Sequence, residues 1–430
     1  MLSVANSKVN IQESRLGSGI VVLTDRMPGV RSATLGFFYR VGSRHEPVEL
    51  NGITHFIEHC VFKGTPRRTA KQIAIEQDRL GGNLDAFTTH DETGFVIKVT
   101  DDRIGDAFDL MADMLTRPVF DETDLENEQR VIIEEMKMHE DAPEELINDI
   151  FYREFFPNDP LGLPITGTPE TVRSFGSQRT RDYHRAAFNP QNLVIAGAGN
   201  VEHEHLLDLI GSADHFSTAC SGDPHSAIRD PRSAAPIFIE QRGDLEQAHM
   251  IVATPFTTAR DERRYAADML ANIIGGGTSS RLWQRVREER GLAYSVGTST
   301  AMYGDTGFFA VSAGTSPDQV EEVLDIVMDE MRWVVRNGVS DDEIGLMKDQ
   351  ARASILLGLE DSAGRAGSLA HCELTHGRQI AVEETLAKID AVTRDDIAEI
   401  AREYFTSENV AFVALGDLEG LTVDRDRLAI

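Results

Sequence analysis

Two histidines and a glutamate close to the N-terminal end of the chain are the residues best suited to chemistry. His55 and His59 begin and end the sequence H-F-I-E-H. On a helix this spacing places both imidazoles on one face, where they can hold a single Zn²⁺. Glu58 is then their neighbour around the helix and can reach a metal-bound water. The pattern predicts a metal site with Glu58 as general base.

A third ligand must come from another segment, because a catalytic Zn²⁺ takes three protein ligands and keeps one position open. The helix expected over 122–139 carries Glu128, Glu134 and Glu135 near its apolar positions. A carboxylate on a core-facing helix is costly unless it is paired or metal-bound. Glu128 and Glu135 share a helix face, but the residue pattern leaves all three glutamates as candidates.

The elements around these residues mix strands and helices. Two β-rich runs at 19–26 and 32–43 are separated by turn residues and predict a hairpin. Apolar residues at helical spacing predict a helix over 105–116, and a further strand is expected at 192–201. Strict β-α-β alternation is lacking, which favours an α+β fold with helices packed on a largely antiparallel or mixed sheet.

The second half of the chain repeats the first. Residues 108–115 resemble 324–331, and residues 185–200 resemble 402–417 at nearly the same separation. Two independent pairs at one separation indicate a duplication, and two copies make a pair of homologous domains rather than a solenoid.

The domain boundaries follow from this repeat. A stretch rich in Ser, Ala, Pro, Asp and Gly at 212–236 has no sustained periodicity and is interpreted as a linker. We therefore expect a metal-binding domain over 1–211 and a homologous domain over 237–430. The second copy contains no H-x-x-E-H and is expected to bind no zinc.

Composition and cysteine content narrow the class of protein. The chain has 430 residues, of which 41% are hydrophobic, as in ordinary globular proteins. Its three cysteines, Cys60, Cys220 and Cys372, are widely spaced without a C-x-x-C pair. This spacing argues against a disulfide framework and against a cysteine-rich zinc site.

The charge is strongly acidic. A formal net charge of −29 disfavours nucleic acid as a partner, since phosphate binding needs clustered positive charge. It suits basic peptides drawn into an acidic cavity, and it equally suits an acidic surface kept for solubility. Long apolar runs and a secretion signal are lacking in the sequence, so we expect no membrane span and a cytoplasmic location.

The segment around the histidines resembles a known family. The sequence G-I-T-H-F-I-E-H-C-V-F-K-G-T at 52–65 is similar to G-x-x-H-F-L-E-H-x-x-F-K-G-T of the insulinase/pitrilysin zinc peptidases. Their H-x-x-E-H order reverses the commoner H-E-x-x-H. The resemblance implies a zinc-dependent endopeptidase with one Zn²⁺ per chain. It also selects Glu135 as the third ligand and gives Glu128 a supporting role beside the metal.

Two further segments resemble the same family. Residues 80–95 are similar to its edge strand, which pairs with the substrate backbone. This implies substrate contacts for Asn83, Ala86, Phe87 and Thr88, although Asp85, His90 and Asp91 depart from the family pattern. Residues 275–299 resemble the C-terminal signature, in which an arginine and a tyrosine contact substrate. The matching residues are Arg287 and Tyr294.

The resemblance covers nearly the whole chain and is closest to bacterial proteins related to mitochondrial processing peptidase β-subunits. In the family, four homologous domains enclose a chamber that favours short or unfolded peptides. A two-domain chain is therefore expected to pair with a second chain, as a homodimer or as a heterodimer with a metal-free homologue. The alternative function is that of a non-catalytic or weakly active scaffold subunit, although such relatives usually lose the ligands.

Overall fold

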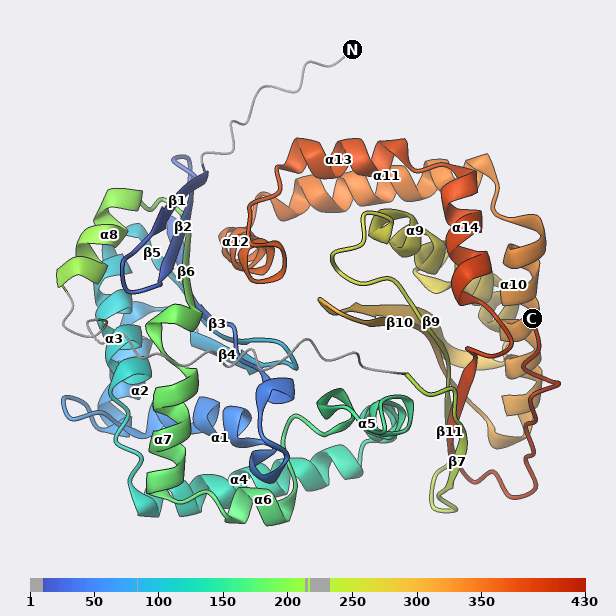
Figure 1. The fold of residues 1–430 in the computed structure, drawn as a ribbon, viewed down its shortest axis with the longest axis horizontal. Helices are drawn as coiled ribbons and strands as arrows, with labels where there is room; N and C mark the ends of the chain where they lie inside the picture. Colours follow the sequence, from blue (N-terminus) through green and yellow to red (C-terminus); the bar gives the residue numbers. More distant parts are fainter. Residues whose placement is uncertain (1–10, 83, 213–215, 217–232) are drawn as a thin grey trace. The chain divides into compact units, whose positions relative to one another are not determined.

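The computed structural model describes residues 11–82, 84–212, 216 and 233–430. Within these residues the chain forms two compact units, each with one β-sheet and helices on both faces (Figure 1). This arrangement confirms the α+β fold with two similar domains that the sequence predicts.

Each unit is assembled from separated stretches of the chain. Of the described residues, the first contains those within 11–136, 164–216 and 355–381; the second contains those within 137–163, 233–354 and 382–430. The units therefore depart from a contiguous division into 1–211 and 237–430, because a helical segment of each half packs on the sheet of the other. Most of the predicted linker 212–236, including Cys220, lies outside the described residues.

The first unit contains a six-stranded sheet in which β4 forms one edge. Its order is β1 (Ile11–Arg15), β2 (Val21–Arg26), β6 (Leu193–Gly199), β3 (Ser32–Tyr39), β5 (Thr93–Thr100), β4 (Leu84–Thr88). Only β2 and β6 pair in parallel. The predicted hairpin between the first two β-rich runs is wrong, because β6 lies between β2 and β3. All seven residues of β6 are buried, as expected for a central strand covered on both faces.

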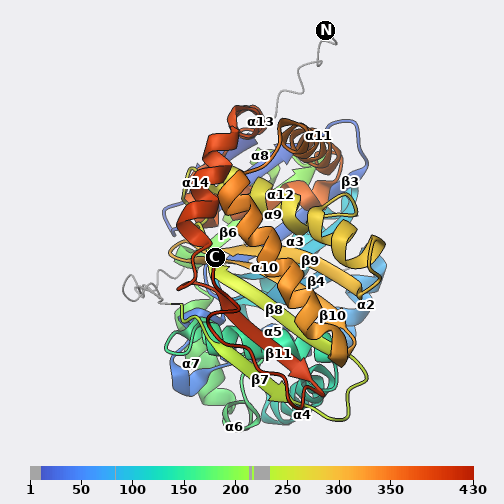
Figure 2. The same cartoon turned by 90° about the vertical axis from the view of Figure 1, so that its right-hand side faces the viewer.

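The second unit repeats this topology with five strands. The order is β7 (Ile237–Gln241), β11 (Ala411–Gly416), β8 (Ala248–Pro255), β10 (Gly307–Thr315), β9 (Ala293–Met302). Here only β7 and β11 pair in parallel, as β2 and β6 do in the first sheet, and β7, β11 and β8 lie side by side in Figure 2. The same order and directions in both sheets agree with the duplication read from the sequence.

Helices cover both faces of the first sheet. The larger core lies under α1 (Ile53–Cys60), α3 (Ile104–Thr116) and α4 (Glu122–Glu140). The opposite face is covered by α12 (Ser362–His376), whose Leu369 packs with strand residues of β2, β3 and β6. The remaining helices of this unit are α2 (Ala70–Leu80), α6 (Pro169–Arg173), α7 (Ser177–Ala187) and α8 (His203–Ser212).

The second sheet is covered in the same manner. One face packs against α5 (Pro143–Phe155) and the other faces α9 (Arg264–Gly275), α10 (Val320–Asn337) and α14 (Arg394–Tyr404). The last two helices are α11 (Asp341–Gly358) and α13 (Val382–Ala391). Across the described part of the chain, none of the helices combines the length and the apolar character that a membrane span requires.

Candidate metal centre

Helix α1 carries the two histidines and is held almost entirely inside the first unit. It begins after Gly52, whose φ of 92° is left-handed. A Cβ at this position would lie 2.6 Å from the Cα of Gly167, so only glycine fits. His55 is buried and His59 is half-buried, and their ring centroids are 4.7 Å apart. The two imidazoles therefore share one face of the helix, as the spacing predicts.

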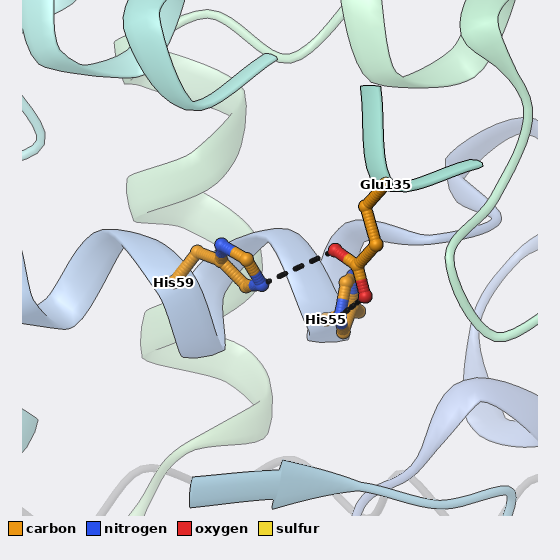
Figure 3. Close-up of side chains that lie close together, drawn as sticks. All are labelled: His55, His59 and Glu135. Carbon is orange, nitrogen blue, oxygen red and sulfur yellow. Dashed lines mark ion pairs between the residues drawn. The ribbon is translucent and has the colours of Figure 1, made fainter. Parts of the chain in front are cut away.

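Helix α4 brings the third side chain to this face. Its buried stripe consists of Leu125, Glu128, Ile132 and Met136, and Glu135 lies at the border of that stripe. Oε1 of Glu135 is 3.8 Å from Nε2 of His55, and its Oε2 is 3.7 Å from Nε2 of His59 (Figure 3). In the described part of the chain, no other three His, Cys, Asp or Glu side chains converge in this way.

The structure separates the three candidate glutamates of α4. Glu135 faces both histidines, whereas Glu134 is exposed. Glu128 is 5% exposed and takes a different position: its Oε2 lies 3.3 Å from Nδ1 of His59. Glu135 thus lies against both histidines and Glu128 against one, and their roles as ligand and support stay predictions.

Glu128 fixes the orientation of His59 and is itself held by Lys63, a residue that the sequence did not predict for this site. Nζ of Lys63 donates to Oε1 of Glu128 at 2.7 Å. Burial opposes the charge of Glu128, but the hydrogen bonds from His59 and Lys63 lower its pKa below the usual value. An ionised carboxylate only accepts, so Nδ1 of His59 donates to Glu128, while Nε2 on the other side of the ring faces Glu135. Lys63 follows His59 by four residues, about one helical turn, and this spacing is the sequence signal that could have indicated that Lys63 lies near His59.

Glu58 lies beside the three-residue cluster and has a partner of its own. It is 9% exposed, and Oγ1 of Thr88 donates to its Oε2 at 2.7 Å. Burial raises the pKa of Glu58, and the charge of Glu135 adds to this, while Thr88 and His59 act in the opposite direction. A carboxylate held at one oxygen, with a raised pKa, is suited to accepting a proton.

The donor set fits a zinc ion. Two imidazoles and a carboxylate match the His₂Glu set of catalytic zinc sites, and their ligand atoms lie within 4.8 Å of one another. Ligands of a tetrahedral Zn²⁺ are about 3.4 Å apart, so small side-chain adjustments suffice. Burial alone would lower the pKa of His59, but the hydrogen bond to Glu128 and the charges of Glu58 and Glu135 outweigh it and raise the pKa. The cluster thus attracts positive charge, which a divalent cation supplies.

Strand β4 borders this cluster at the edge of its sheet. Ala86 packs partly against the core beneath α1, while Phe87 points to the opposite face, where its ring lies tilted against that of Phe38. Thr88, the last residue of β4, reaches Glu58. Asn83 lies outside the described residues.

The residues that depart from the family pattern hold the turn after β4. Nδ1 of the buried His90 lies 3.0 Å from Oγ of Ser43, and Asp91 pairs with Arg44 at 3.2 Å. Burial, together with the charge of Arg44, lowers the pKa of His90 to about 4, so this imidazole is neutral near neutral pH. Asp85 is exposed on β4.

Arg287 and Tyr294 belong to the second unit and contact each other. The guanidinium of Arg287 lies 4.9 Å from the ring of Tyr294 and 4.3 Å from the ring of Trp283. Its Nη1 also donates to the carbonyl oxygen of Tyr294 at 2.7 Å. Tyr294 is 79% exposed, so the pair presents a charged group and a phenol on the surface of this unit.

Comparison with known proteins gives the family. The model described as "Insulinase (Peptidase family M16)" matches residues 21–169, and the model described as "Peptidase M16 inactive domain" matches residues 174–351. A protein from Streptomyces coelicolor named uncharacterized zinc protease is 39% identical over 91% of this chain and 87% of its own length. A Bacillus subtilis protein of the same description is 33% identical over 91% of this chain and 95% of its own length.

Solved structures show the same fold at lower identity. A protease from Helicobacter pylori has a TM-score of 0.87 and 20% identity, covering 94% of this chain and 99% of its own. A chain in a structure of complex III2 from Candida albicans has a TM-score of 0.84 and 21% identity, covering 97% and 100%. The matches of sequence to the family models and to relatives along almost the whole chain confirm the predicted resemblance: the chain belongs to the insulinase (M16) family of peptidases.

Proposed function

We propose that this protein is a zinc-dependent endopeptidase that hydrolyses peptides or unfolded polypeptide segments. The observation that carries the proposal is the convergence of His55, His59 and Glu135 beside a buried carboxylate, Glu58, that can accept a proton. The fold alone does not decide activity, because function depends on the site. A scaffold subunit of the same fold has no need to keep a complete ligand set with its supporting residues.

In this proposal, different residues of the site bind the metal, transfer the proton and orient the base. His55, His59 and Glu135 would hold Zn²⁺, which when bound polarises the scissile carbonyl and acidifies water. Glu58 takes a proton from the attacking water and passes it to the leaving amine nitrogen. Thr88 holds one oxygen of Glu58, which leaves the other oxygen to take the proton.

The edge strand β4 supplies the binding of the substrate backbone in this proposal. An extended peptide added to a sheet edge gains main-chain hydrogen bonds whatever its side chains are. Phe87 is packed against Phe38, so its contribution comes from its backbone. The net charge of −29 favours basic peptides by long-range attraction. As the family resemblance implies, we also propose that a second chain completes a closed chamber, as a homodimer first and a heterodimer second.

A peptide assay with and without chelator tests the proposal. We expect zinc-loaded protein to cleave a quenched fluorescent basic peptide, to lose this activity with a zinc chelator, and to regain it when one equivalent of zinc is restored. Cleavage that is insensitive to chelator would contradict a metal-dependent mechanism. Bound zinc without cleavage of any peptide would instead favour the scaffold alternative.

The Arg287–Tyr294 pair gives a second test, of substrate binding. We propose that both residues contact the bound peptide. Because a hydrogen bond to a charged group contributes about 1.5–3 kcal/mol, Arg287→Ala should lower kcat/KM by about tenfold or more with unchanged zinc content. Arg290→Ala, which removes a nearby arginine paired with Glu322, is the matched control. Equal kinetics of the two variants would remove Arg287 from the substrate site.

A further inference from the structure

A buried carboxylate lies at the N-terminal end of α1, outside the residues assigned so far. Glu46 is 2% exposed. The backbone N–H of Gly52 donates to its Oε2 at 2.7 Å, and the backbone N–H of Thr54 donates to its Oε1 at 2.7 Å. The side-chain amide of Asn51 also approaches Oε2, at 3.4 Å. Both oxygens of Glu46 are therefore bound to groups at the start of one helix.

These contacts provide acceptors for backbone N–H groups at the start of α1. The first four N–H groups of an α-helix have no partner within the helix, and a Ser, Thr, Asp or Asn at the N-cap usually accepts from one of them. Here the N-cap is Gly52, whose close approach to Gly167 excludes any side chain. The capping acceptor must come from elsewhere in the fold. Glu46 supplies it from the preceding loop.

A carboxylate in this position is costly for the fold. Burial raises the pKa of Glu46 to about 7, although hydrogen bonds from Thr54, Gly52 and Asn51 act against this rise. The positive end of the helix dipole favours the charged form at the same place. A buried polar group held at such a cost is expected to fix a geometry that the protein needs.

The geometry in question is that of the first turn of α1. His55 directly follows Thr54, whereas His59 lies in the last turn and is held by Glu128. The two ends of the helix thus have separate supports. Lys63 and Glu128 orient the imidazole of His59, and Glu46 fixes the backbone that carries His55.

We infer that Glu46 is a positioning residue of the metal centre, which holds the first turn of α1 so that His55 faces Glu135. The inference rests on the proposed function in that these histidines are taken as zinc ligands. Supporting residues around metal ligands typically contribute about 10- to 100-fold to metal affinity. Glu46 acts through the backbone rather than through a side chain that touches a ligand, so we expect about a tenfold effect.

The experiment measures zinc affinity by competition with a chromogenic chelator, together with thermal unfolding. Glu46→Gln keeps the size of the side chain but presents an NH₂ group to one of the two backbone N–H groups. We expect zinc to bind about tenfold more weakly, and kcat at saturating zinc to fall while KM for the peptide stays the same. Glu46→Asp keeps the charge but is too short to cap both groups, and should show a smaller loss in the same direction.

A matched control separates positioning from general destabilisation. Glu373 is also buried in the first unit, 1% exposed, with both oxygens bound by Arg15 at 2.9 Å. Glu373→Gln should lower the unfolding temperature without changing zinc affinity. Wild-type zinc affinity in both Glu46 variants would overturn the inference, even if they unfold more easily. Failure of the wild-type protein to bind zinc would instead overturn the proposed function.

Discussion

Replacing Glu58 by Gln is expected to remove most of the peptide hydrolysis while zinc stays bound. The amide of Gln cannot take a proton from water near neutral pH, and general base catalysis contributes about 10²–10⁴-fold to the rate. Gln has nearly the shape of Glu and can still accept from Oγ1 of Thr88, the contact that holds Oε2 of Glu58 at 2.7 Å. We therefore expect kcat to fall by this factor while metal content and unfolding temperature are retained.

The measurement combines kcat of the zinc-loaded variant with metal analysis of the same sample. Glu76→Gln serves as the control, because Glu76 lies on α2 and pairs with Arg68 away from the cluster. Residual activity of Glu58→Gln within a few-fold of wild type would assign the base to another group. Loss of zinc from this variant would show that Glu58 acts on the metal site itself.

The strand and helix content of the fold could largely be predicted from the sequence, but the strand neighbours could not. Apolar periodicity and turn residues place the strands that became β2 and β3, yet they predict the wrong pairing between them. The error arises because β6, far along the chain, is apolar on both faces and takes the central position between the two. Local sequence patterns around β2 and β3 cannot predict that a strand more than 150 residues later in the sequence, on the order of a domain length, pairs with both.

The exchange of helices between the units has a similar cause. The apolar face of α12 fits the sheet formed by β2, β6 and β3, and that of α5 fits the sheet of the other half. Each helix lies in the sequence half whose sheet it does not cover. A duplication read from sequence similarity therefore finds two copies but not the segments that they exchange.

At the candidate metal site, the positions of residues on one helix could be predicted from the sequence, and those of residues from other segments could not. The spacing of His55 and His59 places both on one face by helix geometry alone, with Glu58 next to them around the helix. The choice among the glutamates of α4 depends on which of them reaches the histidines of α1, and the sequence indicates this only by resemblance to a family. Glu46 carries no periodic signal at all, since it acts from a loop on backbone groups.

Replacing Glu135 by Gln is expected to remove most of the bound zinc. Comparing this variant with variants of Glu128 and Glu134 shows which glutamate of α4 is the third ligand. A neutral amide is a weak ligand for Zn²⁺, and the charge that completes the cluster with His55 and His59 is lost. Because loss of a supporting residue costs about 10- to 100-fold in affinity, loss of a ligand should exceed this range. Glu128→Gln should fall within it, since it frees Nδ1 of His59 but leaves all three ligands.

Glu134→Gln is the matched control, because Glu134 is the exposed neighbour of Glu135 on the same helix. Zinc affinity measured by chelator competition should follow the order wild type, Glu134→Gln, Glu128→Gln, Glu135→Gln, with the first two equal. The order follows from the distances to the histidines. Glu135 lies close to both histidines, whereas Glu128 contacts only one of them, at Nδ1 of His59. Glu134 is not part of the cluster. Stoichiometric zinc in Glu135→Gln, with loss of zinc in either other variant, would assign the third ligand to that other glutamate.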